Sequence, residues 1–158
     1  IGCQSLEETV GPERIGVKQA REALETEKDA VYIDVRTEEE FAAGHPEGAI
    51  NIPVGAPHPF RQRLELNPDF VDVVRACVPE HTPILIGCRA GPRAEMAANL
   101  LTQSGYPKVR WVLGGFHGMT DATGIVVAPG WRELGFPESR EAGEGIGYPS
   151  LRKKAGKA

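Results

Sequence analysis

ILIGCRAGPR, residues 84–93, is the stretch that decides the fold. Residues 84–86 are apolar without polar alternation, as expected of a parallel strand that is covered on both faces. Pro92 suits the first turn of a helix, and residues 91–104 carry apolar residues at helical spacing. The pattern therefore predicts a strand that ends at Gly87, a helix that starts near Pro92, and Cys88 at the turn between them.

The surrounding sequence repeats this alternation of strand and helix. Residues 31–35, 49–52 and 109–113 form short runs with the β-branched content of strands. Helical spacing is found in residues 17–27 and 68–78, and Thr37 with Glu40 forms a capping box for a short helix. Alternation of this kind predicts an α/β fold, an open sheet of about five mostly parallel strands with helices on both faces.

The chain is long enough for one domain. Its 158 residues fall within the roughly 100–200 residues of a single domain, and no internal repeat is visible. We place this domain at residues 10–137. Residues 138–158 are rich in glycine and charge and are expected to form a flexible tail. Residues 119–135 are expected to add a lid or an edge element to the domain.

Composition excludes several classes of protein. The net charge of −4 comes without a basic patch, so we expect no nucleic-acid partner, and no apolar run approaches the ~20 residues of a membrane span. Three scattered cysteines do not make a disulfide framework, and no His/Cys cluster has metal-ligand spacing, so we expect no metal. The chain opens on Ile1, and Cys3 is either the remnant of a lipoprotein signal or a residue near an arbitrary boundary. A cytoplasmic and a periplasmic location both remain open.

The turn around Cys88 has the features of a reactive site. Ligands of open α/β sheets bind at the carboxyl ends of strands, and the amides of a tight strand-to-helix turn can form an anion-binding nest. The dipole of the helix and the side chains of Arg89 and Arg93 add positive potential. These effects favour the thiolate over the thiol, which makes Cys88 the candidate nucleophile rather than an inert buried cysteine. Cys77 lies in a helical pattern without such a context and is assigned to packing.

Four motifs resemble those of the rhodanese superfamily, in the order in which that family has them. Residues 88–93 resemble its CxxGxR active-site loop, and residues 31–36, VYIDVR, resemble its DVR strand. FAAGHPEGAINIP, residues 41–53, resembles the family's FxxGHIxGAxNIP signature, and LGGF, residues 113–116, resembles its LxGG turn. Pro46 replaces the usual isoleucine, and Ala94 replaces a frequent serine.

The resemblance implies a single-domain thiosulfate sulfurtransferase that needs no metal or organic cofactor. It would move a sulfane sulfur from thiosulfate or a related small-molecule donor to a thiol or cyanide acceptor, through a persulfide on Cys88. The expected site has catalytic residues Cys88 and Arg93, and substrate-binding residues Arg89, Ala90, Gly91 and Pro92. A non-catalytic persulfide carrier or a sulfur-relay or regulatory module, with a protein persulfide partner, would carry the same residues.

Two other activities are weighed against this one. Phosphatases with a similar fold have five residues between cysteine and arginine, whereas Cys88 and Arg93 enclose four, a loop that suits a sulfur-sized anion. A thiol redox protein would need a Cys77–Cys88 disulfide.

Further side chains are assigned supporting roles. Asp34, Arg36 and Glu40 are expected to form an ion-pair network, and His45 to form a hydrogen bond in its turn rather than to act as a base. Phe60, His117 and Trp131 are expected to pack in the core or on the surface, or to line the mouth of the site.

Overall fold

A five-stranded parallel sheet forms the centre of the molecule in the computed structural model, which describes residues 11–157. The strand order is β1-β8-β7-β2-β4, and every neighbouring pair is parallel. The strands are β1 (Glu13–Gly16), β8 (Val109–Leu113), β7 (Ile84–Gly87), β2 (Val31–Asp34) and β4 (Ile50–Asn51). This confirms the predicted α/β fold, with the edge strand β1 as an addition. Cys3 lies outside the described residues.

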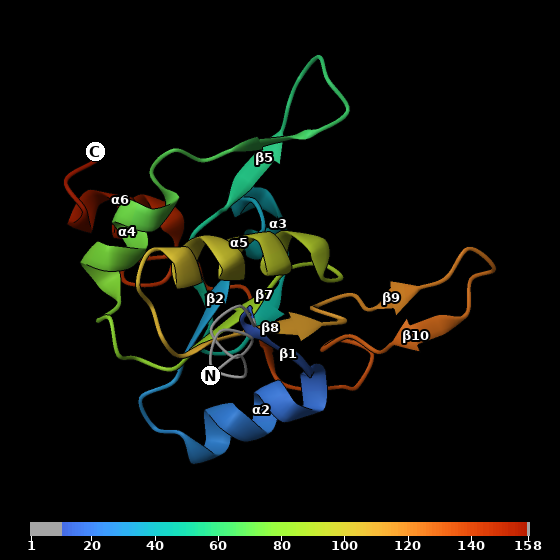
Figure 1. Cartoon of the computed structure of the whole chain (residues 1–158). Coiled ribbons are helices and arrows are strands. Elements are labelled where there is room, and N and C mark those ends of the chain that lie inside the picture. Colours follow the sequence, from blue (N-terminus) through green and yellow to red (C-terminus); the bar gives the residue numbers. More distant parts are fainter. Residues whose placement is uncertain (1–10, 158) are drawn as a thin grey trace, which may run out of the picture.

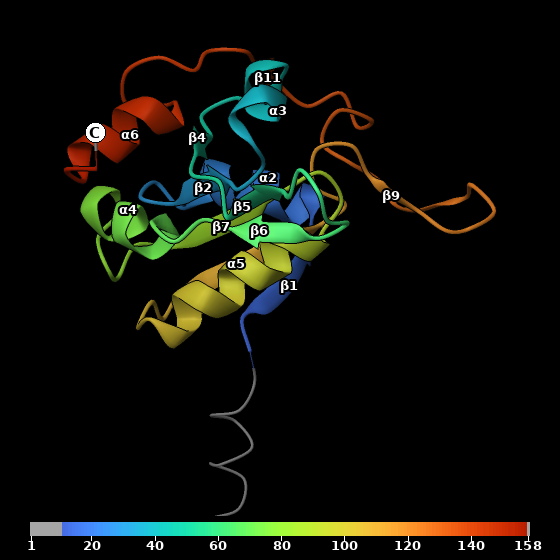
Figure 2. The same ribbon diagram turned by 90° about the horizontal axis from the view of Figure 1, so that it is seen from above.

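Helices cover both faces of this sheet (Figures 1 and 2). α2 (Val17–Thr26) covers one face, and α4 (Phe70–Cys77) and α5 (Pro92–Gln103) cover the other, with α6 (Tyr148–Lys154) against α4. The short α3 (Glu38–Ala42) follows the carboxyl end of β2. Within residues 11–157 no helix is long and apolar enough to cross a membrane.

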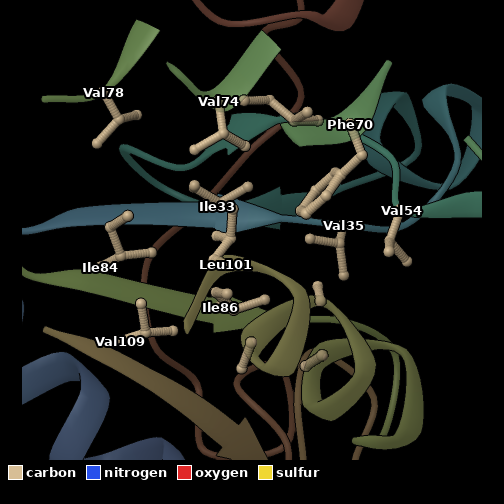
Figure 3. Packing of buried hydrophobic residues seen from close by; sticks show 14 of the residues in the cluster. Ile33, Val35, Val54, Phe70, Val74, Val78, Ile84, Ile86, Leu101 and Val109 are labelled. Carbon is tan, nitrogen blue, oxygen red and sulfur yellow. The ribbon is translucent and has the colours of Figure 1, made fainter. Parts of the chain in front are cut away.

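The sheet separates two apolar clusters because side chains alternate along each strand. On β7, Ile84 and Ile86 belong to the cluster under α4 and α5, whereas Leu85 belongs to the cluster under α2. Figure 3 shows Ile33, Ile84, Ile86 and Leu101 packed together in the first of these clusters. Burial on both faces explains the uninterrupted apolar run of residues 84–86.

Three short antiparallel pairs are added to this core. They are β3 (His45–Pro46) with β11 (Glu138–Ser139), β5 (Gly55–Pro57) with β6 (Leu64–Leu66), and β9 (Met119–Thr120) with β10 (Val126–Ala128). The β5–β6 and β9–β10 hairpins project from the body of the molecule (Figure 1). The expected extra element in residues 119–135 is thus the β9–β10 hairpin, which does not extend the central sheet. Asp121 closes its turn by accepting hydrogen bonds from the amides of Thr123 and Ile125.

Residues 148–157 are folded, whereas the sequence suggested a flexible tail over residues 138–158. α6 buries Tyr148 and Leu151 in the cluster under α4, and the Asn67 side-chain amide donates a hydrogen bond of 2.9 Å to the Tyr148 hydroxyl. Lys157 forms ion pairs with Asp69 and Asp72. α6 has two buried residues, Tyr148 and Leu151, within a charge-rich segment, and the partner of Tyr148 lies about 80 positions earlier in the chain. The composition of the segment therefore does not predict its packing.

We expect Leu151→Ala to lower the free energy of unfolding by about 2–3 kcal/mol, because it leaves a cavity between α6 and α4. This loss of stability lies at the low end of the range for leucine-to-alanine substitutions, because a terminal helix can relax into the cavity. Urea unfolding followed by circular dichroism measures this change. The exposed neighbour Lys153→Ala serves as the control and should change it by less than about 0.5 kcal/mol. Equal stabilities of the two variants would contradict the packing of α6.

Candidate active site

Cys88 lies directly after β7, at the carboxyl edge of the sheet, where the sequence placed it. The residue is buried, with an exposed fraction of 2%, and belongs to the apolar cluster under α4 and α5. Gly91 caps α5 and Pro92 is in its first turn, so the loop from Cys88 to Gly91 is a compact strand-to-helix connection. The thiol therefore lies near the amino end of a twelve-residue helix.

The backbone carbonyls of this loop are bound by a second turn, residues 114–117. The amides of Phe116 and His117 donate hydrogen bonds of 2.9 Å to the carbonyls of Cys88 and Arg89, and the amide of Gly114 donates one of 2.6 Å to that of Ala90. The turn needs glycine at Gly115, which has a φ of 52° and where a Cβ would overlap the Cys88 carbonyl. Three successive loop carbonyls are thus held by one neighbour.

The loop amides remain available. Within residues 11–157 the amides of Arg89, Ala90 and Gly91 have no backbone acceptor, and the amide of Arg93 is one of the donors that every helix leaves free in its first turn. Free amides beside a helix terminus can bind an anion. This arrangement has the properties expected of the predicted cradle, and the assignment of Arg89, Ala90, Gly91 and Pro92 to substrate binding stays a prediction.

Arg93 is bound by Glu40, 53 positions away in sequence. Its Nη1 and Nη2 donate hydrogen bonds of 2.7 and 3.0 Å to the two carboxylate oxygens of Glu40. Glu40 also completes the capping box of α3 with Thr37, as the sequence predicted. The pair links α3 to the first turn of α5 and so holds the helix that follows the Cys88 loop. Arg93 is positioned as an anchor of the loop, and its contact with a donor stays a prediction.

Burial of Glu40 raises the pKa of its carboxyl, but hydrogen bonds from Arg93 and Thr37 outweigh this and hold the pKa at about 2, below the ordinary 4.5. A lowered pKa in the folded state means that the ionised carboxylate stabilises the fold above about pH 4.5, and that this contribution is lost as the pH falls towards 2. We expect Glu40→Gln to lower the free energy of unfolding by about 1–2 kcal/mol at pH 7.

The difference between wild type and Glu40→Gln should shrink between pH 4.5 and pH 2. Urea unfolding at a series of pH values measures it. Glu38→Gln, in the same first turn but without an ion pair among the described residues, is the matched control. A difference that does not change with pH would contradict the ion-pair origin of the stabilisation.

Asp34 and Arg36 form a separate ion pair beneath the site. Both are buried, and Arg36 Nη2 donates hydrogen bonds of 2.7 Å to Asp34 Oδ2 and to the Gly44 carbonyl. The Arg36 guanidinium also lies over the ring of Phe116, 4.7 Å from its centroid. Phe116 is the residue whose amide holds the Cys88 carbonyl. The expected network of Asp34, Arg36 and Glu40 is therefore two pairs, one below the loop and one beside it.

The two histidines near these pairs have different surroundings. His45 is buried, stacks on Phe41 and has its Nδ1 2.8 Å from the Phe41 carbonyl, the hydrogen-bonding role that the sequence analysis assigned to it. Burial lowers the pKa of His45. Burial and then the charges of Arg36, Arg132 and Arg89 lower the pKa of the exposed His117. Both shifts favour the neutral imidazole.

Cys77 has the packing role that the sequence analysis gave it. Its Sγ lies 3.7 Å from the Leu151 carbonyl, and burial raises the pKa of its thiol. Cys77 and Cys88 are both free thiols, so the disulfide that a thiol redox protein would need is not formed. A thiol whose pKa is raised is a poor attacking group at neutral pH.

A groove of about 1170 Å³ opens above the loop. Arg89 and Arg93 line it near Cys88, the first turn of α3 forms one side, and the β5–β6 hairpin forms another. Tyr148, from α6, also lines it. The groove was not predicted from the sequence, because its hairpin is visible there only as a proline-rich loop around His58.

Comparison with known proteins identifies the family model and relatives that the chain matches. Residues 16–122 match the model of the rhodanese-like domain. Thiosulfate sulfurtransferase 18 of Arabidopsis thaliana is 37% identical over 109 residues, which cover 68% of this chain and 77% of that protein. The senescence-associated protein DIN1 of Raphanus sativus is 35% identical over 107 residues, 66% of this chain and 55% of that protein. The crystal structure of Rv0390 from M. tuberculosis superimposes with a TM-score of 0.69 and 29% identity, over 84% of this chain and 100% of that one.

Proposed function

The chain belongs to the rhodanese-like domain family, and from this premise we propose that it is a thiosulfate sulfurtransferase that works through a persulfide on Cys88. The observation that carries the proposal is the loop itself. A thiol follows a buried strand, three loop carbonyls are bound by residues 114–117, and the amides of the loop are free beside the amino end of α5. The name of the Arabidopsis relative supports the same activity.

The reaction has two displacement steps. In the first, the Cys88 thiolate attacks the outer sulfur of thiosulfate, the S–S bond of thiosulfate breaks, and sulfite leaves with the electron pair of that bond. The enzyme then carries a persulfide whose terminal sulfur is an anion, for which the loop amides supply donors. Arg89, which is exposed and forms no ion pair among the described residues, attracts the anionic donor.

In the second step a thiol attacks the terminal sulfur. The bond between that sulfur and Cys88 breaks, Cys88 leaves as a thiolate, and the acceptor takes the sulfur as its own persulfide. The proton of the acceptor thiol remains with the product or passes to water. No electrons enter or leave the system, so the step needs no further reductant.

Thiosulfate alone should release one sulfite per enzyme and add about 32 Da to the peptide that contains Cys88. A burst assay for sulfite and mass spectrometry of the digested protein measure these two results. Absence of both with thiosulfate would contradict the proposed donor. Continued release of sulfite when cyanide or a thiol is added distinguishes an enzyme from a persulfide carrier, which would stop after one equivalent.

A further inference from the structure

The groove beside the Cys88 loop, which Arg89 and Arg93 line, is larger than the proposed donor requires. Its volume of about 1170 Å³ exceeds the roughly 300–1000 Å³ of pockets that enclose whole drug-sized ligands, whereas thiosulfate has only five heavy atoms. Much of its lining is apolar and comes from prolines and leucines of the β5–β6 hairpin, notably Pro57, Leu64 and Leu66. A small anion does not need an apolar surface of this size, whereas an extended polypeptide can pack its apolar side chains against it.

The tip of the β5–β6 hairpin is held in shape by His58. The amide of His58 donates a hydrogen bond to the Arg63 carbonyl, and His58 Nδ1 accepts one of 3.0 Å from the amide of Phe60. On the other side of the ring, His58 Nε2 lies 3.4 Å from the carboxylate of Glu65. The side chain of Phe60 is nevertheless 91% exposed. A large apolar side chain on a preorganised backbone is a common feature of recognition surfaces.

The charges of the hairpin indicate what it recognises. Arg61 and Arg63 line the groove, are exposed, and form no ion pair with any residue in 11–157. Arg89 lies in the same groove and is likewise without an ion-pair partner there. Arg93, in contrast, is neutralised by Glu40, and the Glu65 carboxylate lies beside the imidazole of His58. The opposite side of the groove carries Glu38 and Glu39, which are also exposed and without an ion pair among residues 11–157, so the unmatched positive charge is confined to the hairpin and Arg89. On the hairpin side, the guanidinium groups of Arg61 and Arg63 complement carboxylates.

We propose that the β5–β6 hairpin docks a polypeptide acceptor whose cysteine is flanked by acidic residues, with its carboxylates on Arg61 and Arg63 and its apolar groups against Phe60 and the groove. This rests on the proposed function, since the docked cysteine is the thiol that attacks the Cys88 persulfide. The acceptor thiol bonds to the terminal sulfur, Cys88 leaves as a thiolate, and the polypeptide leaves as a persulfide.

The experiment uses two synthetic peptides with a single cysteine, flanked by glutamates in one and by lysines in the other. Wild-type enzyme with thiosulfate should transfer sulfur to the acidic peptide with a kcat/KM about tenfold or more above that for the basic peptide at low salt, and the gap should narrow as salt rises. The salt dependence of this preference is measured on the wild-type enzyme alone. Arg61→Glu with Arg63→Glu should remove or reverse the preference.

The matched control is Arg14→Glu with Lys18→Glu. These exposed residues lie on β1 and α2, outside the groove, and the double substitution changes the net charge by the same amount. It should keep the preference for the acidic peptide. If it removes the preference as completely as the hairpin variant does, net charge rather than the hairpin is responsible, and the proposal is wrong.

A binding measurement separates the two proposals. Fluorescence anisotropy of a labelled acidic peptide with serine in place of cysteine reports docking without any sulfur transfer, and Phe60→Ala should weaken it about fivefold or more. A normal sulfite burst with equal binding of acidic and basic peptides would overturn the docking proposal alone. A missing burst would overturn the proposed function even if the acidic peptide binds.

Discussion

Cys88→Ser is expected to lower the rate of sulfite release from thiosulfate by at least about three orders of magnitude. A serine hydroxyl is not ionised at neutral pH and is a weak nucleophile towards sulfur, so the first displacement fails even if the donor still binds. The substitution replaces one atom at a position surrounded by bound carbonyls and by the core, and the loop should keep its shape. The assay is the sulfite burst, with the mass of the digested loop peptide as a second readout.

Cys77→Ser is the matched control, because it makes the same atomic change in a cysteine that packs beside Leu151. It should retain activity within about twofold. Sulfite release by Cys88→Ser at a rate near that of the wild type would show that another group accepts the sulfur. Loss of activity in both variants, with normal folding, would point to a pathway through both thiols.

The burial of Cys88 also bears on how long the proposed persulfide would survive. The Cys88 residue has an exposed fraction of 2%, and its loop neighbours Arg89 and Arg93 line the groove. A persulfide formed at this buried position, as we propose, is expected to lose its sulfur mainly to an acceptor that reaches it from the groove. Burial would then favour selective transfer over spontaneous loss of the sulfur. For the same reason, the shape of the hairpin that lines the groove would determine which acceptors can take the sulfur.

The central sheet and the Cys88 loop are the parts that the sequence predicts well. Apolar runs such as residues 84–86 lie in parallel strands that are buried on both faces, and Gly115 of the 114–117 turn lies where the backbone meets the loop. In both cases the physical requirement acts on neighbouring residues. The resulting pattern is therefore local and can be read along the chain.

Contacts between residues that are distant in sequence, and short secondary-structure elements, are not predicted by such local patterns. β1 is a short edge strand with two charged residues, so it lacks an apolar run. Arg93 and Glu40 are both visible in their motifs, but nothing in either motif states that they meet. The packing of α6 depends on Asn67 and Asp69 in distant segments, whereas the glycine and charge content of residues 138–158 predicted a flexible tail.

Asp34→Ala is expected to cost more stability than any other substitution considered, about 3–5 kcal/mol, because it leaves the buried guanidinium of Arg36 without its counter-charge. Among residues 11–157, the Gly44 carbonyl and the face of Phe116 would remain as partners of the guanidinium. For a chain of this size the loss corresponds to a decrease in Tm of about 6–20 °C. Urea unfolding by circular dichroism and a thermal scan measure the two quantities. Glu39→Ala, an exposed carboxylate without an ion pair among residues 11–157, is the control and should change stability by less than about 0.5 kcal/mol.

The double variant Asp34→Ala with Arg36→Met decides whether the unpaired charge is the cause. Replacing the guanidinium by an apolar side chain removes that charge, so the double variant should be more stable than Asp34→Ala alone. If it is less stable, the packing of Arg36 against Phe116 matters more than its charge. Because Phe116 also binds the Cys88 carbonyl, we expect Asp34→Ala to lower the sulfite burst rate at temperatures where the protein is still folded. An unchanged burst rate would mean that the loop is held by the 114–117 turn independently of the ion pair beneath it.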